Sequence, residues 1–140
     1  MRSALLLAAA IAFTAVADAQ TPAPAAAPGI KRTILHRMDV EGGREVVIAI
    51  AEIPAGMAAG RHSHFGPESG VVLEGSSSLE IEGETPRLLK EGDSYAILAG
   101  KVHDAKAVGD APSKVLATYV VEKGKPLATP VSGAAQRLER

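Results

Sequence analysis

Hydrophobic residues from Lys31 onward occur in short runs that are separated by glycine and proline. The longest run, residues 46–53 (VVIAIAEI), is rich in β-branched residues and has Gly-Gly before it and Pro-Ala-Gly after it. A short apolar run with turn residues at both ends is typical of a buried strand. This part of the chain therefore predicts strands rather than helices.

Residues 77–82 show a second pattern, in which polar and apolar side chains alternate from Ser78 onward. Leu79 and Ile81 fall on one face and Ser78 and Glu80 on the other, as in a strand with one face toward the core. Further short strands are predicted at residues 70–73, 87–89, 95–98, 102–108 and 115–121. Many short strands at regular spacing, with no convincing helical period between them, indicate an all-β sandwich or barrel rather than a βαβ fold.

The N-terminal segment differs in character from the predicted strands. Arg2 precedes an apolar stretch at residues 4–16, and residues 17–19 (Ala-Asp-Ala) offer the small side chains that a signal peptidase reads. We predict a signal peptide at residues 1–19, with cleavage before Gln20. A retained anchor helix is the weaker alternative, because the stretch is shorter than the roughly 20 residues that span a bilayer. The mature protein is therefore expected in the periplasm or the medium, with no membrane association.

The rest of the chain is predicted to hold one domain. Residues 20–30 contain mainly alanine and proline, a composition typical of a disordered linker. The folded barrel is expected at residues 31–130, which is enough chain for one compact core. Residues 131–140 are expected to be a C-terminal tail that forms a short amphipathic helix or frays.

Charge and composition exclude several classes of function. The chain has 15 basic and 16 acidic residues, a formal net charge of −1 and a pI of about 6.4, so it has no basic field to attract nucleic acid. It has no cysteine, which excludes disulfides, thiolate metal sites and a cysteine nucleophile. Any metal site must therefore use nitrogen and oxygen ligands.

The candidate chemistry of the chain lies in three histidines and one glutamate. His62 and His64 are two residues apart, so on a strand both imidazoles point to the same face. Glu68 follows a Gly-Pro pair that can turn the chain back toward them, and His103 lies at the start of another predicted strand. Such ligands suit one divalent transition metal (iron, manganese, nickel, copper, cobalt or zinc) and not calcium or magnesium. The remaining histidine, His36, is interpreted as a surface residue.

The spacing of these residues and of the glycines around them resembles the two conserved motifs of the cupin superfamily. The first motif matches position for position: Gly56, five residues, His62-Ser63-His64, three residues, Glu68, six residues and Gly75. The second motif matches in spacing: Gly92, five residues, Leu98, one residue, Gly100, two residues and His103. The sequence departs from the family at Leu98, where proline is usual, and at Ala107, where asparagine is usual. Neither position is a metal ligand in the family pattern.

The resemblance covers roughly residues 45–121 and implies a small single-domain cupin, an antiparallel double-sheet jelly-roll barrel. It also implies that the metal is held by His62, His64, Glu68 and His103, the same four residues that were selected from their own pattern. The alternative is a cupin barrel that has lost its metal. Such members usually lack one or more of the ligands, whereas this chain has all four.

Alternation along the predicted strands also describes the walls of the site. Small or apolar residues share a face with His103 or with Glu68: Ala105, Ala107, Gly70 and Val72. We therefore expect a dry cavity with few polar groups to orient a substrate. Tyr95 is a candidate for the mouth of this cavity, and Tyr119 is interpreted as core packing.

Three functions remain open on the sequence. The first is a metal-dependent dioxygenase of the quercetinase-like kind, in which the resemblance implies Glu68 as the catalytic base. The second is a lyase, isomerase or decarboxylase that uses the metal as a Lewis acid. The third is a non-catalytic module that binds a small ligand, with sugars disfavoured because the chain has no tryptophan. Each takes a small molecule as partner, and a homodimer formed through the strand at residues 46–53 is also considered.

Overall fold

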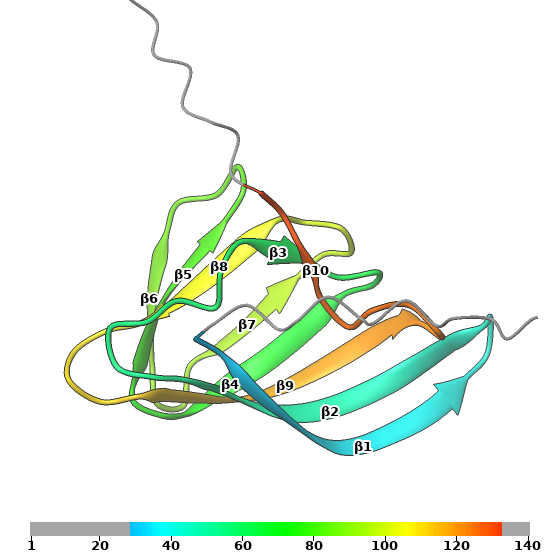
Figure 1. Ribbon diagram of the computed structural model, residues 1–140, viewed down its shortest axis with the longest axis horizontal. Coiled ribbons are helices and arrows are strands. Elements are labelled where there is room, and N and C mark those ends of the chain that lie inside the picture. The colour runs from blue at the N-terminus through cyan, green and yellow to red at the C-terminus, as the bar shows by residue number, and fades with distance from the viewer. Residues whose placement is uncertain (1–28, 133–140) are drawn as a thin grey trace, which may run out of the picture.

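Two antiparallel sheets of five strands face one another in the computed structural model, which describes residues 29–132 (Figure 1). The first sheet has the order β1-β2-β9-β4-β7, with β1 at Lys31–Val40, β2 at Arg44–Ile53, β9 at Ser113–Glu122, β4 at Glu68–Glu74 and β7 at Ser94–Ile97. The second sheet has the order β10-β3-β8-β5-β6, with β10 at Thr129–Pro130, β3 at His62–Ser63, β8 at His103–Ala107, β5 at Ser76–Ile81 and β6 at Arg87–Lys90. Within residues 29–132 every helix or strand element is a strand, which confirms the predicted all-β jelly-roll barrel. No helix in this part of the chain is long and apolar enough to cross a membrane.

The core lies between the two sheets and is built by alternation along the strands. In β2 every second residue from Glu45 to Ile53 is buried, and the residues between them are half-buried. Val47 of β2 lies in the same buried cluster as Leu79 and Ile81 of β5, which belong to the opposite sheet. The alternation seen in the sequence at residues 77–82 therefore predicted correctly which side chains enter the core.

The strand at residues 46–53 lies inside its sheet and not at an edge. β2 pairs with β1 on one side and with β9 on the other along nearly its whole length. The expectation that this strand offers a free edge to a homodimer is therefore wrong, because its backbone groups are already used in two ladders. The long edge strand of this sheet is β1, which the hydrophobic pattern did not single out.

The predictions for the two ends of the chain fall largely outside the described residues. The signal peptide, nearly all of the linker and most of the C-terminal tail lie in residues 1–28 and 133–140. These boundaries stay predictions.

Two glycines allow the close approaches that bring β4 and its neighbours together. A Cβ atom on Gly66 would lie 1.9 Å from the carbonyl oxygen of Val120, so only glycine fits where the chain turns toward Glu68. A Cβ atom on Gly70 would lie 2.7 Å from the hydroxyl oxygen of Tyr95 and 2.8 Å from its ring. Gly70 therefore leaves the space that the Tyr95 side chain occupies beside β4.

Candidate metal centre

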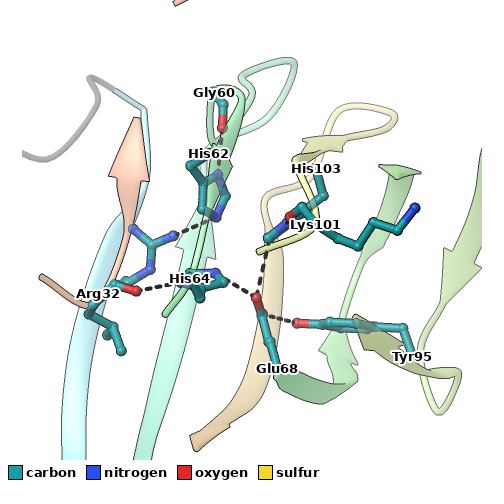
Figure 2. A network of polar contacts seen from close by, with 9 residues as sticks. Arg32, Gly60, His62, His64, Glu68, Tyr95, Lys101 and His103 are labelled. Carbon is teal, nitrogen blue, oxygen red and sulfur yellow. Dashed lines mark hydrogen bonds and ion pairs between the residues drawn. The ribbon is translucent and has the colours of Figure 1, made fainter. Parts of the chain in front are cut away.

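The four predicted ligand residues come together between the two sheets (Figure 2). His62 lies in β3, His64 just after it, Glu68 at the start of β4 and His103 at the start of β8. β3 and β8 pair at a single position, which places His62 directly opposite His103. All four residues are buried, and each offers one ligand atom that lies within 4.8 Å of the other three.

The atoms that face one another in this group lack hydrogen-bond partners. Glu68 Oε2 lies 2.8 Å from His64 Nε2 and 3.3 Å from His103 Nε2. All three atoms are buried, yet none has a well-directed hydrogen bond. A buried polar atom without a partner costs roughly 1–3 kcal/mol, and three of them aimed at one point are not expected in a site of purely structural role. A cation bound among them would satisfy all three, so the residues present fit a metal ion.

The other ring nitrogen of each histidine contacts a backbone carbonyl oxygen. His62 Nδ1 lies 2.6 Å from the oxygen of Gly60, and His103 Nδ1 lies 2.9 Å from that of Lys101. His64 Nδ1 contacts the carbonyl oxygen of Leu127, which comes from the segment that leads into β10. Because a carbonyl only accepts, each Nδ1 carries a proton, so Nε2 is the ring nitrogen that can bind a metal. This is the tautomer that metal-binding histidines adopt.

The protonation states of the group also suit a metal. Burial lowers the pKa of His62 to about 4, so its imidazole is neutral at pH 7. Burial alone would raise the pKa of Glu68, but contacts with the imidazoles of His103 and His64 and with the Tyr95 hydroxyl outweigh it and hold this pKa below its ordinary value. His62 thus presents a neutral nitrogen and Glu68 an ionised carboxylate, the forms that bind metals.

Tyr95 holds the second oxygen of Glu68. Its hydroxyl donates a hydrogen bond of 2.7 Å to Glu68 Oε1, which leaves Oε2 free for the centre (Figure 2). Burial beside this carboxylate raises the pKa of Tyr95, so the phenol stays protonated. Tyr95 was expected only at the mouth of the cavity, and its bond to Glu68 was not predicted. Tyr119 is buried in the core as expected, with its ring 4.9 Å from that of His64.

Arg32 is a site residue that the sequence reasoning missed. It lies in β1 opposite Ala51, whose side chain points inward, and its Nη2 lies 3.3 Å from His62 Nε2 (Figure 2). The expectation of few polar groups near the metal is therefore incomplete. A weak signal was present in the sequence, because Arg32 lies two residues after Ile30, which also lines the cavity, and so shares its face.

A small cavity of about 40 Å³ adjoins the group. Apart from the candidate ligands, Arg32 and the two tyrosines, its walls are apolar and include Ile53, Ala59 and Ala105. The predicted inward positions of Ala105 and Ala107 are both confirmed. Ala105 lines the cavity, and Ala107 packs in a buried cluster with Ile53 and Ala59. One water molecule needs roughly 10–15 Å³ of cavity volume, so a cavity of about 40 Å³ holds about three water-sized groups.

Comparison with known proteins agrees with this architecture. A family model described as a cupin domain matches residues 49–135. No curated protein is significantly similar to the chain in sequence. Among solved structures, the DMSP lyase DddQ from Ruegeria pomeroyi superposes with a TM-score of 0.61 at 23% identity, over 73% of this chain and 51% of the lyase.

Two further structures have the same fold. KdgF from a Halomonas species superposes with a TM-score of 0.55 at 23% identity, over 66% of this chain and 80% of KdgF. An oxalate oxidase in complex with the substrate analogue glycolate superposes with a TM-score of 0.60 at 20% identity, over 74% of this chain and 55% of the oxidase. This chain thus spans about half the length of the lyase and of the oxidase. Likeness at these identities shows the fold alone.

Proposed function

We propose that this chain, which belongs to the cupin domain family, is a metal-dependent enzyme that transforms a small organic substrate bound beside the metal. One observation carries the proposal. His64 Nε2, His103 Nε2 and Glu68 Oε2 are buried, converge on one point and have no hydrogen-bond partners, and a cavity opens next to them. A site that served packing alone would neither leave these atoms unpaired nor keep a cavity beside them.

Each residue has a separate task in this proposal. A bound transition metal would supply Lewis-acid or redox chemistry. His62, His64 and His103 direct their Nε2 atoms to the centre, because backbone carbonyls bind Nδ1 of each ring. Glu68 is the one carboxylate in the cavity wall among the described residues, so it is our candidate base for a substrate proton. Tyr95 keeps Glu68 oriented and ionised through its bond to Oε1.

The dioxygenase is our first candidate reaction, and the apolar wall supports it. Most residues that line the cavity are aliphatic, which limits the access of bulk water to a reactive intermediate. A lyase, isomerase or decarboxylase is the second candidate. The hydrogen bond between Tyr95 and Glu68 favours this second candidate. A protonated phenol next to a carboxylate forms an acid–base pair, and proton transfer by this pair does not require dioxygen.

Oxygen uptake by the metal-loaded protein distinguishes the candidates. The iron, manganese, nickel, copper and cobalt forms would each be mixed with a flavonol and with small enediol and hydroxy-acid substrates. Uptake that is lost in His62→Ala but kept in His36→Ala supports the dioxygenase, since His36 is an exposed histidine outside the site. Substrate loss without oxygen uptake supports the second candidate. Tight binding with no turnover in any metal form would contradict an enzyme and leave a binding module.

We also propose that the protein is exported. The charged start, apolar stretch and Ala-Asp-Ala sequence of residues 1–19 support a signal peptide. Mass spectrometry of the mature protein from its native host should find Gln20 at the N-terminus. A mature chain that still begins at Met1 would contradict the proposal. A homodimer stays a prediction, but not one formed by edge pairing of β2.

A further inference from the structure

Among the described residues, Arg32 brings the only guanidinium or ammonium group to the wall of the cavity, and no acidic side chain of this part of the chain pairs with it. Within residues 29–132 no ion pair joins Arg32 to a carboxylate. Its Nε atom is buried without a hydrogen-bond partner. The contact of its Nη2 is with His62 Nε2, at 3.3 Å. A half-buried guanidinium is therefore held at the centre with much of its donor capacity unused.

Metal binding would remove the acceptor that Arg32 now has. His62 Nδ1 donates to the carbonyl of Gly60, so the lone pair of Nε2 is the only one that its ring can offer. A metal ion and the Arg32 guanidinium compete for this lone pair. Once the metal takes it, Arg32 is left beside the centre with neither an ion-pair partner nor this acceptor. A ligand that enters the cavity can supply both.

The charge of the cavity points to an anion. Among the described residues, Glu68 is the only carboxylate and Arg32 the only guanidinium or ammonium group in its wall. Their charges cancel, so the two charges of a divalent metal remain uncompensated in a largely apolar space. Isolated charge in such surroundings is costly. An anionic ligand would neutralise it.

We propose that the substrate is a small carboxylic acid whose carboxylate is bound by Arg32 beside the metal. The planar guanidinium matches a carboxylate with two parallel hydrogen bonds, which a lysine cannot do. The volume of about 40 Å³ limits the size of the substrate, because space for about three water-sized groups admits only the smallest organic acids. This inference rests on the proposed metal-dependent function and adds the substrate class to it.

Calorimetric binding of glycolate to the metal-loaded full chain tests the inference without turnover. Glycolate should bind the unaltered protein, whereas its neutral counterpart glycolamide should bind weakly. In Arg32→Gln the affinity for glycolate should fall by about 10- to 100-fold, the usual effect of losing a charge-assisted hydrogen-bond pair. Arg32→Lys keeps the charge, so its affinity for glycolate should lie between those of Arg32→Gln and the unaltered protein. Arg87→Gln, which removes an exposed arginine of β6 outside the cavity, should bind like the unaltered protein.

Metal content and thermal stability are measured in parallel, so the possible failures can be told apart. If Arg32→Gln and Arg32→Lys keep their metal and bind glycolate as tightly as the unaltered protein, Arg32 does not recognise the carboxylate. If either variant loses its metal, Arg32 supports His62 instead, and the inference is again overturned. Absence of binding by glycolate, pyruvate and oxalate to the metal-loaded protein would overturn the substrate class. Failure of the unaltered protein to retain any metal would overturn the proposed function itself.

Discussion

Replacing Tyr95 with phenylalanine removes a single hydroxyl group, the one that contacts the candidate metal ligand Glu68. That hydroxyl donates to Glu68 Oε1 at 2.7 Å. The ring can stay in the space beside Gly70, because phenylalanine adds no atoms. The variant therefore isolates one hydrogen bond to a buried carboxylate, without a new cavity of any size.

The magnitude follows from the charge of the acceptor. A hydrogen bond to a charged group contributes roughly 1.5–3 kcal/mol, and its loss here leaves Glu68 Oε1 buried with no partner. Glu68 must be ionised to bind a metal, so losing its donor makes that form less favourable. At 1.4 kcal/mol for each tenfold change in affinity, we expect metal binding to weaken by about 10- to 100-fold. Loss of an outer-shell partner of a metal ligand commonly has an effect of this size.

The assay is a competition between the protein and a chromophoric chelator for zinc or manganese. The matched control is Ser77→Ala, which removes another buried hydrogen bond, of 2.6 Å to Ser113 Oγ, outside the cavity wall. Ser77→Ala should lower the unfolding temperature and leave metal affinity unchanged. A Tyr95→Phe protein that binds metal within about twofold of the unaltered protein would refute the role given to this bond.

Three further predictions concern stability. The metal-free protein should lose stability as pH falls from about 6.5 to 4, because burial lowers the pKa of His62 from 6.5 to about 4 and the unfolded chain then binds the proton first. Urea unfolding after chelation measures this, and equal stability at pH 7 and pH 4.5 would contradict it. Gly66→Ala should destabilise the fold by at least about 2 kcal/mol, a fall in melting temperature of roughly 10 °C, because its Cβ would lie 1.9 Å from the Val120 oxygen. Thermal melting followed by circular dichroism measures this, and a melting curve unchanged from that of the unaltered protein would contradict the prediction. Finally, metal at about 100 times its dissociation constant should stabilise the protein by about 2.7 kcal/mol. Calorimetry with and without a chelator should therefore show a shift of roughly 10–20 °C, and the absence of any shift would argue against a specific site.

The parts of the fold that were predicted correctly depend on local patterns. The alternation around Leu79 and Ile81 identifies an inward face without knowledge of any partner strand. The spacing of His62, His64 and Glu68 places three side chains together through a strand and a turn. Cupin-like motifs add His103 and with it the barrel. In each case a few neighbouring residues carry the whole signal.

The parts that were missed depend on pairing between distant segments. The register of β1 on β2 sets Arg32 opposite Ala51, and β1 is otherwise almost entirely exposed, so its own sequence shows no buried face. The carbonyl that orients His64 belongs to Leu127, 63 residues further along. Every residue has a backbone carbonyl, so the sequence alone does not indicate that the carbonyl of Leu127 contacts His64. The interior position of β2 likewise follows from the whole strand order, which an apolar run does not specify.

An anomalous difference map from crystals grown with the native metal tests the central claim most directly. Data collected on both sides of the metal absorption edge should show one peak per chain, among the Nε2 atoms of His62, His64 and His103 and Oε2 of Glu68. A peak at any other place on the molecule would contradict the account. So would the absence of a peak from these four atoms in crystals of protein that contains stoichiometric metal by elemental analysis.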